Sequence, residues 1–192
     1  MTIRKIRKKE LKEAYFFQDK MLNPAGKKRY RTFSYVKKQF NRHPNLFVGC
    51  FDKRKLMGVI FGYVKKTAVL LGEFAVSSKC RKRKIGTKLL YFFEKEAKKL
   101  RKKKICLGSR EEAEKFYLKK GYSPFLFVQI RKKDIPRNFS EIKNKYNIIK
   151  QTNYTDGPRL VIKVKRLNSR LKGKVKKDFK AYDVIYVFEK IL

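Results

Sequence analysis

The residues best placed to do chemistry lie between Gly72 and Leu90, where an apolar run, a basic loop and an amphipathic stretch follow one another. The apolar run ends at Val76, and a helical pattern begins at Gly86. The first N–H groups of a helix have no partner inside the helix and lie at the positive end of its dipole. This order of elements therefore predicts a phosphate-binding site formed by the loop and the start of the helix.

The spacing in this loop resembles the pyrophosphate loop of the GNAT superfamily of N-acetyltransferases, which reads Arg/Gln-x-x-Gly-x-Gly/Ala. Arg81, Ile85 and Gly86 occupy the family's positions, whereas Lys84 stands in place of the first glycine. In the family, that glycine lets the backbone approach the pyrophosphate closely. A side chain at position 84 would either weaken the binding of the coenzyme or add a charge contact, and the sequence leaves both readings open.

A second motif follows about thirty residues later. Residues 113–122 resemble the family's pattern Ala-x-x-apolar-Tyr-x-x-x-Gly-Phe/Tyr. Ser109 and Glu112 have the spacing of a capping box at the start of this predicted helix, and Gly121 suits its end. The family often has Asn seven residues before the tyrosine, and this chain has Arg110 there. The usual contact of that position near the coenzyme is therefore not expected here.

The resemblance implies that acetyl-CoA is the co-substrate. It implies that main-chain groups of Phe74, Ala75 and Val76 pair with the pantetheine arm. It also implies that the pyrophosphate is wrapped by the residues of the following loop and helix start: Arg81, Lys82, Arg83, Lys84, Ile85, Gly86 and Thr87. A run of charged side chains is usually solvated, so we expect at most two of the three side chains at 81–83 to touch the coenzyme.

Acyl transfer to an amine requires a neutral amine, a stabilised carbonyl oxygen and a proton for the leaving thiolate. Glu73 lies at a position similar to the acidic residue at the end of the family's strand, and it is the candidate base, acting directly or through water. Its alternative role is a carboxylate paired with a neighbouring Lys or Arg. By resemblance, Tyr117 is the candidate acid that protonates the sulfur of coenzyme A, and its alternative role is an aromatic side chain packed on a helix face.

Apolar periodicity predicts the elements that must position these residues. It predicts strands over residues 2–7, 46–51, 56–63, 68–76, 104–107, 125–130, 160–164 and 184–188. It predicts helices over 9–22, around 35–40, over 85–100 and from 109 to 121. A polar excursion runs from 135 to 158, and the strands predicted after it flank a basic segment at 171–179. If the last strand closes the sheet, the excursion is an insertion that returns to it.

This order is what the family resemblance implies: an α/β (α+β) fold with a mixed, mostly antiparallel central sheet and helices on both faces. We expect residues 1–132 to form the acetyl-CoA-binding core and residues 133–192 to form a basic C-terminal extension. The end of that extension, residues 182–192, is expected to supply the strand that closes the sheet beside the strand at 125–130.

Length and composition limit the other possibilities. A chain of 192 residues that is 42% hydrophobic can bury one good core and an appendage. We expect no membrane span, because no apolar stretch is long enough to cross a bilayer. The odd number of cysteines, Cys50, Cys80 and Cys106, favours free thiols in a reducing, cytoplasmic compartment. A metal site is not expected, because His43 is the only histidine and no Cys-x-x-Cys pair is present.

The balance of charge points to an acidic partner. The chain has 54 Lys and Arg against 16 Asp and Glu, a formal net charge of +38. Most of these cations have no acid to pair with, and clusters such as 102–104 and 170–177 would suit the phosphates of nucleic acid or a ribonucleoprotein. The alternative is a generally basic protein without a specific partner.

Two functions remain open on the sequence. The first is an N-acetyltransferase that moves an acetyl group from acetyl-CoA to a primary amine of a protein or small molecule by direct attack. The second is a non-catalytic protein that kept this fold and binds RNA or DNA through its basic surface. Lys84 and Arg110, which depart from the family pattern, favour the second. The sequence identifies neither the acceptor amine nor the oligomeric state.

Overall fold

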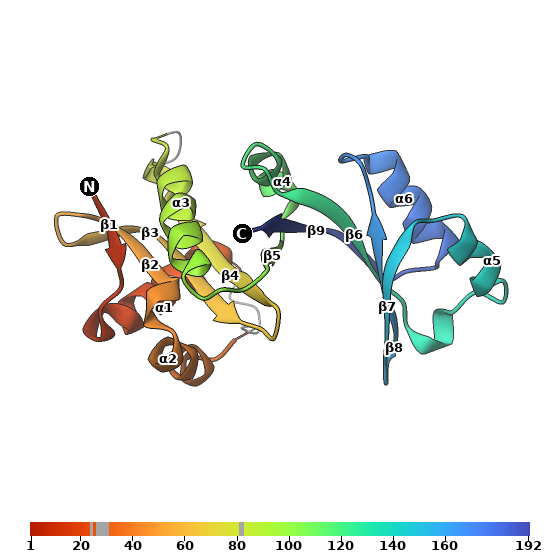
Figure 1. Ribbon diagram of the computed structural model, residues 1–192, viewed down its shortest axis with the longest axis horizontal. Helices are drawn as coiled ribbons and strands as arrows, with labels where there is room; N and C mark the ends of the chain where they lie inside the picture. The colour runs from red at the N-terminus through yellow and green to blue at the C-terminus, as the bar shows by residue number, and fades with distance from the viewer. Residues whose placement is uncertain (24, 26–30, 81–82) are drawn as a thin grey trace. The chain divides into compact units, whose positions relative to one another are not determined.

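The computed structural model describes residues 1–23, 25, 31–80 and 83–192, and the chain divides into two compact units (Figure 1). Unit 1 contains residues 1–105 and 191–192. Unit 2 contains residues 106–190. The predicted division at residue 132 is a different one and stays a prediction.

Four strands of unit 1 form an antiparallel meander. In sheet order they are β1 (Thr2–Lys5), β2 (Phe47–Asp52), β3 (Lys55–Val64) and β4 (Ala68–Val76). Its α-helices are α1 (Leu11–Leu22), α2 (Phe33–Arg42) and α3 (Ile85–Lys98). Short 3-10 turns occur at Lys8–Glu10, Pro44–Leu46 and Ser78–Cys80.

Helix α3 covers one face of this meander, in front of the strands in Figure 1. Two glycines of β3 let it approach closely. A Cβ at Gly58 would lie 2.9 Å from the side chain of Leu89, and a Cβ at Gly62 would lie 2.5 Å from the ring of Phe93. Both α3 side chains are fully buried, so α3 is held by its apolar stripe, as its sequence periodicity predicts.

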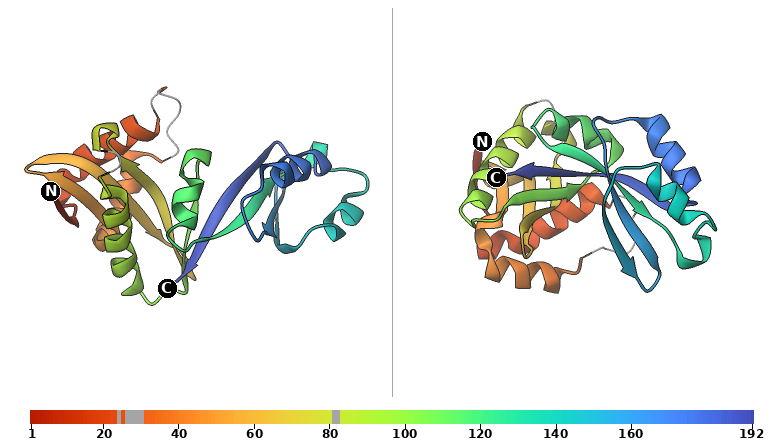
Figure 2. Two further views of the ribbon diagram at one scale, coloured as in Figure 1. Left: turned by 90° about the horizontal axis from the view of Figure 1, so that it is seen from above. Right: turned by 45° about the vertical axis from the view of Figure 1, so that its right-hand side comes forward.

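The opposite face of the meander is aromatic. The ring centroid of Phe47 lies 5.2 Å from that of Phe40 in α2, 5.0 Å from that of Phe61 and 6.2 Å from that of Tyr63. Helix α1 lies against β3 and β4, on the side away from α3 (Figure 2). The sheet of unit 1 therefore has helices on both faces, as expected.

Unit 2 is built on antiparallel pairs of β6 with β9, β6 with β8, and β7 with β8. Its strands are β5 (Lys104–Gly108, whose first residues belong to unit 1), β6 (Ser123–Gln129), β7 (Ile148–Tyr154), β8 (Gly157–Lys163) and β9 (Asp183–Ile191). Its helices are α4 (Glu111–Leu118), α5 (Phe139–Asn144) and α6 (Ser169–Asp178), with a 3-10 turn at Lys132–Asp134. The strand expected at the end of the chain is present as β9, and it pairs with β6.

The predicted fold class, a mixed α/β architecture with mostly antiparallel strands, is confirmed. The polar excursion at 135–158, for which no element was predicted, contains α5 and β7. Strand β7 carries mostly exposed residues and no buried ones, so it shows no apolar alternation that could reveal it. Its pairing with β8 is what makes it a strand.

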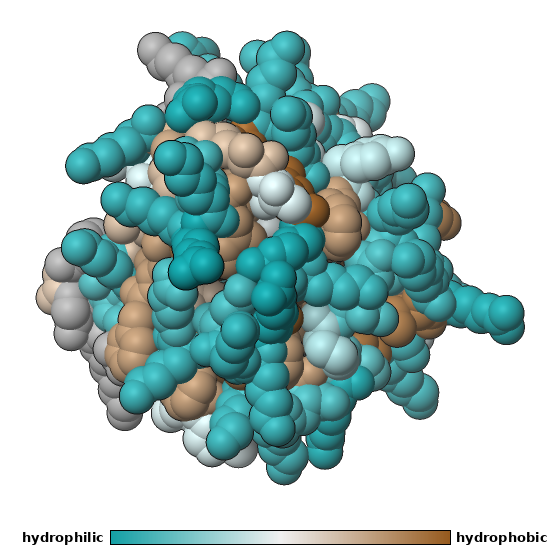
Figure 3. All heavy atoms as spheres, turned by 90° about the vertical axis from the view of Figure 1, so that its left-hand side faces the viewer, coloured by the Kyte–Doolittle hydropathy of each residue, from teal (hydrophilic) through white to brown (hydrophobic). Residues whose placement is uncertain are grey.

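Hydrophilic side chains project from most of the face shown in Figure 3, with apolar side chains visible between them. Among the described residues, no helix is long and apolar enough to cross a membrane. The same residues include no group of three or more His, Cys, Asp and Glu side chains that could hold a metal ion. All three cysteines are free thiols, with Cys50 and Cys80 buried.

Candidate functional site

The strand, loop and helix expected around residues 68–98 are present as β4, a short turn and α3. Strand β4 ends at Val76, and the next residue is anchored by a hydrogen bond from the N–H of Ser77 to the carbonyl of Met57. The chain then makes a 3-10 turn at Ser78–Cys80, which buries the thiol of Cys80. Two of the predicted coenzyme-binding residues, Arg81 and Lys82, lie outside the described residues.

Lys84 lies at the junction between the loop and α3. It is the N-cap residue of α3, its φ is +57° in the left-handed region, and its carbonyl accepts the N–H of Lys88. A residue with a Cβ pays about 1 kcal/mol for this conformation, which glycine adopts freely. Lys84 therefore keeps the backbone conformation suited to the glycine that the family has at this position.

The start of α3 offers main-chain donors. The Lys84 side chain makes no capping hydrogen bond to it. Arg83 and Lys84 are exposed, Ile85 is buried, and Gly86 and Thr87 are half-buried. Exposed cations beside the positive end of a fourteen-residue helix suit an anionic group such as a pyrophosphate. Described loop residues thus fit the coenzyme that the resemblance implies.

On β4, Glu73 is a buried carboxylate with a partner on each oxygen. The guanidinium of Arg31 donates to Oε1 at 2.7 Å, and the hydroxyl of Tyr63 donates to Oε2 at 2.6 Å. Tyr63 is fully buried on the neighbouring strand β3. We refer to Arg31, Tyr63 and Glu73 as the carboxylate cluster.

Packing around Arg31 fixes the geometry of this cluster. The hydroxyl of Tyr15 donates to the Arg31 carbonyl at 3.0 Å, and the guanidinium lies 4.7 Å from the centroid of the Tyr63 ring. Thr32 caps α2 by accepting the N–H of Tyr35, whose ring stacks 5.7 Å from that of Tyr63. Helix α2 thus begins directly beside the buried carboxylate.

Burial raises the pKa of Glu73 above its ordinary value, and the hydrogen bond from Tyr63 and the charge of Arg31 partly offset this effect. Burial and the nearby Glu73 charge raise the pKa of Tyr63, so Tyr63 stays protonated and is the donor in their hydrogen bond. A carboxylate with a raised pKa is a stronger base than an exposed one. The ion pair with Arg31 is also the alternative role that the sequence left open for Glu73.

The N-cap of helix α4, which carries Tyr117, lies one residue later than expected. The predicted capping box of Ser109 and Glu112 is wrong, because the N-cap is Arg110 and its side chain makes no capping bond. Ser109 instead extends the sheet pairing, with its N–H donating to the carbonyl of Tyr186 in β9. Its hydroxyl donates to the Arg110 carbonyl at 2.8 Å.

The end of α4 agrees with the sequence. Gly121 has a φ of +77°, and its N–H donates to the carbonyl of Leu118. The N–H of Tyr122 donates to the carbonyl of Tyr117, which completes a Schellman motif. The rings of Tyr117 and Tyr122 pack 5.8 Å apart, the apolar contact that accompanies such motifs.

Tyr117 is 5% exposed, and its ring also lies 5.6 Å from that of Phe188. Burial raises its pKa, so the phenol stays protonated at neutral pH. This packing is the alternative role that the sequence left open for Tyr117. The catalytic role stays a prediction.

The structure brings Glu73 together with two residues that the sequence analysis did not select, Arg31 and Tyr63. In the strand register Glu73 lies opposite Phe61 and Tyr63 lies opposite Leu70. The Tyr63 ring reaches Glu73 by lying over Gly72, where a Cβ would be 2.2 Å from the ring. No sequence pattern gives this contact. Arg31 directly precedes Thr32, the N-cap of α2, and no sequence pattern around it marks it as a partner of Glu73.

Comparisons with known proteins agree with this architecture. The family model described as "Acetyltransferase (GNAT) domain" matches residues 19–134, more than half of the chain. No curated protein matches the sequence.

Among solved structures, Ard1 from Thermoplasma volcanium is similar at 18% identity and a TM-score of 0.55, over 87% of this chain and 98% of that one. The PaiA N-acetyltransferase from Thermoplasma acidophilum, solved with coenzyme A, is similar at 18% identity and a TM-score of 0.54, over 85% and 98%. The ribosomal-protein-S18-alanine N-acetyltransferase from Escherichia coli is similar at 14% identity and a TM-score of 0.54, over 99% and 92%. At these identities the likeness shows the fold.

Proposed function

Because the chain belongs to the GNAT family of acetyltransferases, we propose that it is an N-acetyltransferase that moves an acetyl group from acetyl-CoA to a primary amine by direct attack. The observation that carries the proposal is the junction of β4 and α3, where Lys84 adopts a left-handed conformation at the start of α3. Acetyl-CoA supplies the acetyl group as a thioester. The described groups of the chain that would hold its pyrophosphate are the N–H groups at 83–87 and the exposed charges of Arg83 and Lys84.

Glu73 is the proposed base. An amine attacks only when neutral, so its proton must leave, and a carboxylate with a raised pKa accepts a proton more readily than an ordinary one. The amine nitrogen forms a bond to the thioester carbon, the carbon–sulfur bond breaks, and the proton lost by the nitrogen passes to Glu73 directly or through water. Arg31 and Tyr63 position the carboxylate, and both favour its ionised form.

Tyr117 is the proposed donor to the leaving sulfur. Its raised pKa keeps its hydroxyl protonated. A thiol has an ordinary pKa of about 8.5, so complete proton transfer from this phenol to a thiolate is uphill. Tyr117 therefore acts chiefly by hydrogen bonding to the sulfur as negative charge develops on it.

The first acceptors to test are peptide N-termini. Two similar solved structures contain a peptide or a peptide-like ligand: Naa50 from Arabidopsis thaliana with the bisubstrate analogue CoA-Ac-MVNAL, and the NatC complex with a Gag peptide and CoA. Three free thiols support a reducing, cytoplasmic location for this reaction. Small-molecule amines are the other acceptor class.

The test is release of coenzyme A from acetyl-CoA in the presence of pools of short peptides and of small-molecule amines, followed by mass spectrometry of the products. We expect at least one peptide pool to gain an acetyl group on its N-terminal amine. Glu73→Gln should lower kcat about 100-fold or more, the usual size of a lost general base, and Tyr117→Phe about tenfold. Peptide and amine pools that all stay unacetylated would contradict the proposal.

The second candidate, a non-catalytic protein that uses this fold to bind nucleic acid, is favoured by Lys84 and Arg110. The structure weakens part of that argument, because Lys84 keeps a backbone conformation suited to glycine. Saturable acetyl-CoA binding together with turnover would exclude the candidate, whereas binding without turnover on any amine would favour it.

A further inference from the structure

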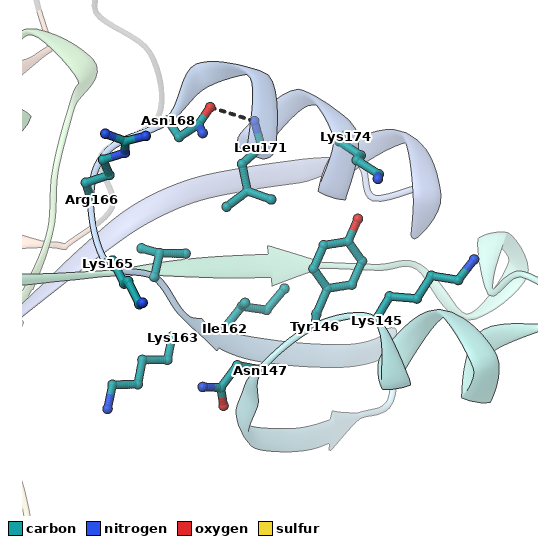
Figure 4. A pocket seen from close by; sticks show the side chains of 11 residues that line it. Lys145, Tyr146, Asn147, Ile162, Lys163, Lys165, Arg166, Asn168, Leu171 and Lys174 are labelled. Carbon is teal, nitrogen blue, oxygen red and sulfur yellow. Dashed lines mark hydrogen bonds between the residues drawn. The ribbon is translucent and has the colours of Figure 1, made fainter.

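A hollow in unit 2 has an unusual concentration of positive charge. It has a volume of about 440 Å³ and lies between the end of α5, the end of β8 and the start of α6 (Figure 4). Five of its eleven lining residues are cations: Lys145, Lys163, Lys165, Arg166 and Lys174. None of those eleven, all within the described part of the chain, is acidic. We refer to this feature as the basic hollow.

Below the charged rim, the basic hollow is apolar. Tyr146, Ile162 and Leu171 line it, and Figure 4 shows Tyr146 rising from its floor toward Lys174. Asn147 adds a side-chain amide beside Ile162. A flat apolar group would fit the floor while an anionic chain lay along the rim.

The walls of the basic hollow are held in place by hydrogen bonds. The Tyr146 hydroxyl donates to Asp178 Oδ2 at 2.6 Å. This hydrogen bond fixes the Tyr146 ring and engages the Asp178 carboxylate. Asn168 caps α6 by accepting the N–H of Leu171 at 3.0 Å, and its own N–H donates to the hydroxyl of Tyr186 at 2.8 Å. The N–H of Lys163 donates to the carbonyl of Asn147 at 2.9 Å, which joins two walls.

The segment that forms one wall of the basic hollow is strongly basic as far as Asp178, whose carboxylate accepts the Tyr146 hydroxyl. Residues 163–177 contain eight Lys and Arg and no Asp or Glu. Like charges at this density repel one another, and bound anions relieve that repulsion. The volume lies in the range of small-molecule sites, about 300–1,000 Å³, so it accommodates one nucleotide but not a duplex.

We propose that the basic hollow binds single-stranded nucleic acid, with one unpaired base on the apolar floor and the neighbouring phosphates on the rim cations. An unpaired base can leave the stack and lie against an aromatic or apolar surface, whereas a paired base cannot. An acidic peptide would satisfy the rim but would not use the floor. This inference does not depend on acetyl transfer.

The test is fluorescence anisotropy of the full-length protein with a labelled 12-nucleotide oligo-uridine strand over a range of salt concentrations. The variant Lys163→Gln/Lys165→Gln/Arg166→Gln removes three exposed rim charges. The matched control, Lys53→Gln/Arg54→Gln/Lys55→Gln, removes three exposed charges from the turn between β2 and β3. Circular dichroism checks that both variants fold.

We expect the rim variant to weaken binding about tenfold or more and to reduce the salt slope by about 2, since each lost phosphate contact removes about 0.7 from the slope for a single strand. The control should change the affinity less than about threefold. Equal weakening by the two variants, or no binding by the wild type, would overturn the proposal.

Three further ligands identify what the basic hollow recognises. An abasic strand of the same length should bind about tenfold or more weakly, because base stacking contributes about 1–3 kcal/mol per base. Poly-glutamate and inorganic tripolyphosphate should compete poorly at equal charge concentration. An abasic strand that binds as tightly as oligo-uridine would overturn the placement of a base. Effective competition by poly-glutamate would assign the surface to an acidic protein, and effective competition by tripolyphosphate would assign it to a small polyphosphate.

Discussion

At the scale of single residues, the carboxylate cluster is the feature that sequence reasoning described least completely. The sequence identified Glu73 as a candidate base or an ion-paired carboxylate, and the structure shows the ion pair. The two roles are compatible, because partners that hold a buried carboxylate also set its pKa. What separates the roles is whether changing a partner alters the pH dependence of turnover.

If Glu73 is the base, kcat/KM should rise with pH through the pKa of its carboxyl, which burial holds above 4.5. Arg31→Met removes a charge that lowers this pKa, so the acid limb should move to higher pH by about 1 unit or more. Arg31→Lys keeps a cation and should leave the limb close to that of the wild type. A limb that stays in place in Arg31→Met would assign Glu73 to structure alone.

A second carboxylate, Glu10, allows a prediction about the stability of the fold alone. It accepts two hydrogen bonds from Arg4 at 2.7 and 2.8 Å, and these hold its pKa at about 2 against an ordinary 4.5. Because its pKa is lowered by folding, its stabilising contribution is present above pH 4.5 and is lost as the pH falls toward 2. After discounting for partial exposure, Glu10→Gln should lower the free energy of unfolding at pH 7 by about 1–2 kcal/mol.

Urea unfolding at pH 7 and at pH 2 measures this contribution. The difference between Glu10→Gln and the wild type should shrink at the lower pH. The matched control is Glu13→Gln, which changes an exposed acid at the start of α1 and should have little effect at either pH. A Glu10→Gln difference that does not depend on pH would contradict the assignment.

At the scale of elements, the junctions between strands and helices carry the family pattern. The Schellman motif at the end of α4 needs a left-handed residue, and Gly121 supplies it with a φ of +77°. A Cβ at Gly121 would meet nothing within 4 Å, so only its backbone conformation opposes substitution.

Gly121→Ala should therefore lower the free energy of unfolding by about 1–2 kcal/mol. Gly173, inside α6, is the matched control, because a Cβ there also meets nothing within 4 Å and its backbone is helical. Gly173→Ala should raise the free energy of unfolding by about 0.5–1 kcal/mol. Urea titrations followed by circular dichroism measure both, and two changes of the same sign would contradict the account.

Many of the strands and helices were predictable from local sequence patterns. The strand at 68–76 has the predicted bounds, and the helix after it starts one residue before Gly86, because apolar periodicity is a local signal. The missed elements and contacts depend on distant partners. Strand β7 forms through its pairing with β8, and Ser109 pairs with β9 and does not cap α4. Tyr63 reaches Glu73 from the neighbouring strand because its ring lies over Gly72, which has no Cβ.

At the scale of the whole molecule, the formal charge of +38 opposes compactness. The charge is spread over residues 1–132 and 133–192 alike, so self-repulsion acts throughout the chain. Salt screens this repulsion, since the Debye length falls from about 30 Å at 0.01 M to about 8 Å at 0.15 M. The basic hollow gathers five of the chain's cations around one cavity.

The melting temperature should therefore rise by several degrees when sodium chloride is raised from about 10 to 300 mM. Differential scanning calorimetry measures the rise, with sucrose at the same osmolality as the control for effects unrelated to charge. A melting temperature that falls or stays constant over this range would show that the cations are already balanced within the protein.

The central claim, that the junction of β4 and α3 binds acetyl-CoA, is tested most directly by isothermal titration calorimetry at 150 mM salt. The wild type should bind one acetyl-CoA per chain. Gly86→Asp, which places a negative charge at the start of α3, should abolish binding. Gly173→Asp, the same substitution on exposed helix α6, should leave it unchanged. No binding by the wild type at millimolar acetyl-CoA, or equal binding by Gly86→Asp, would contradict the account.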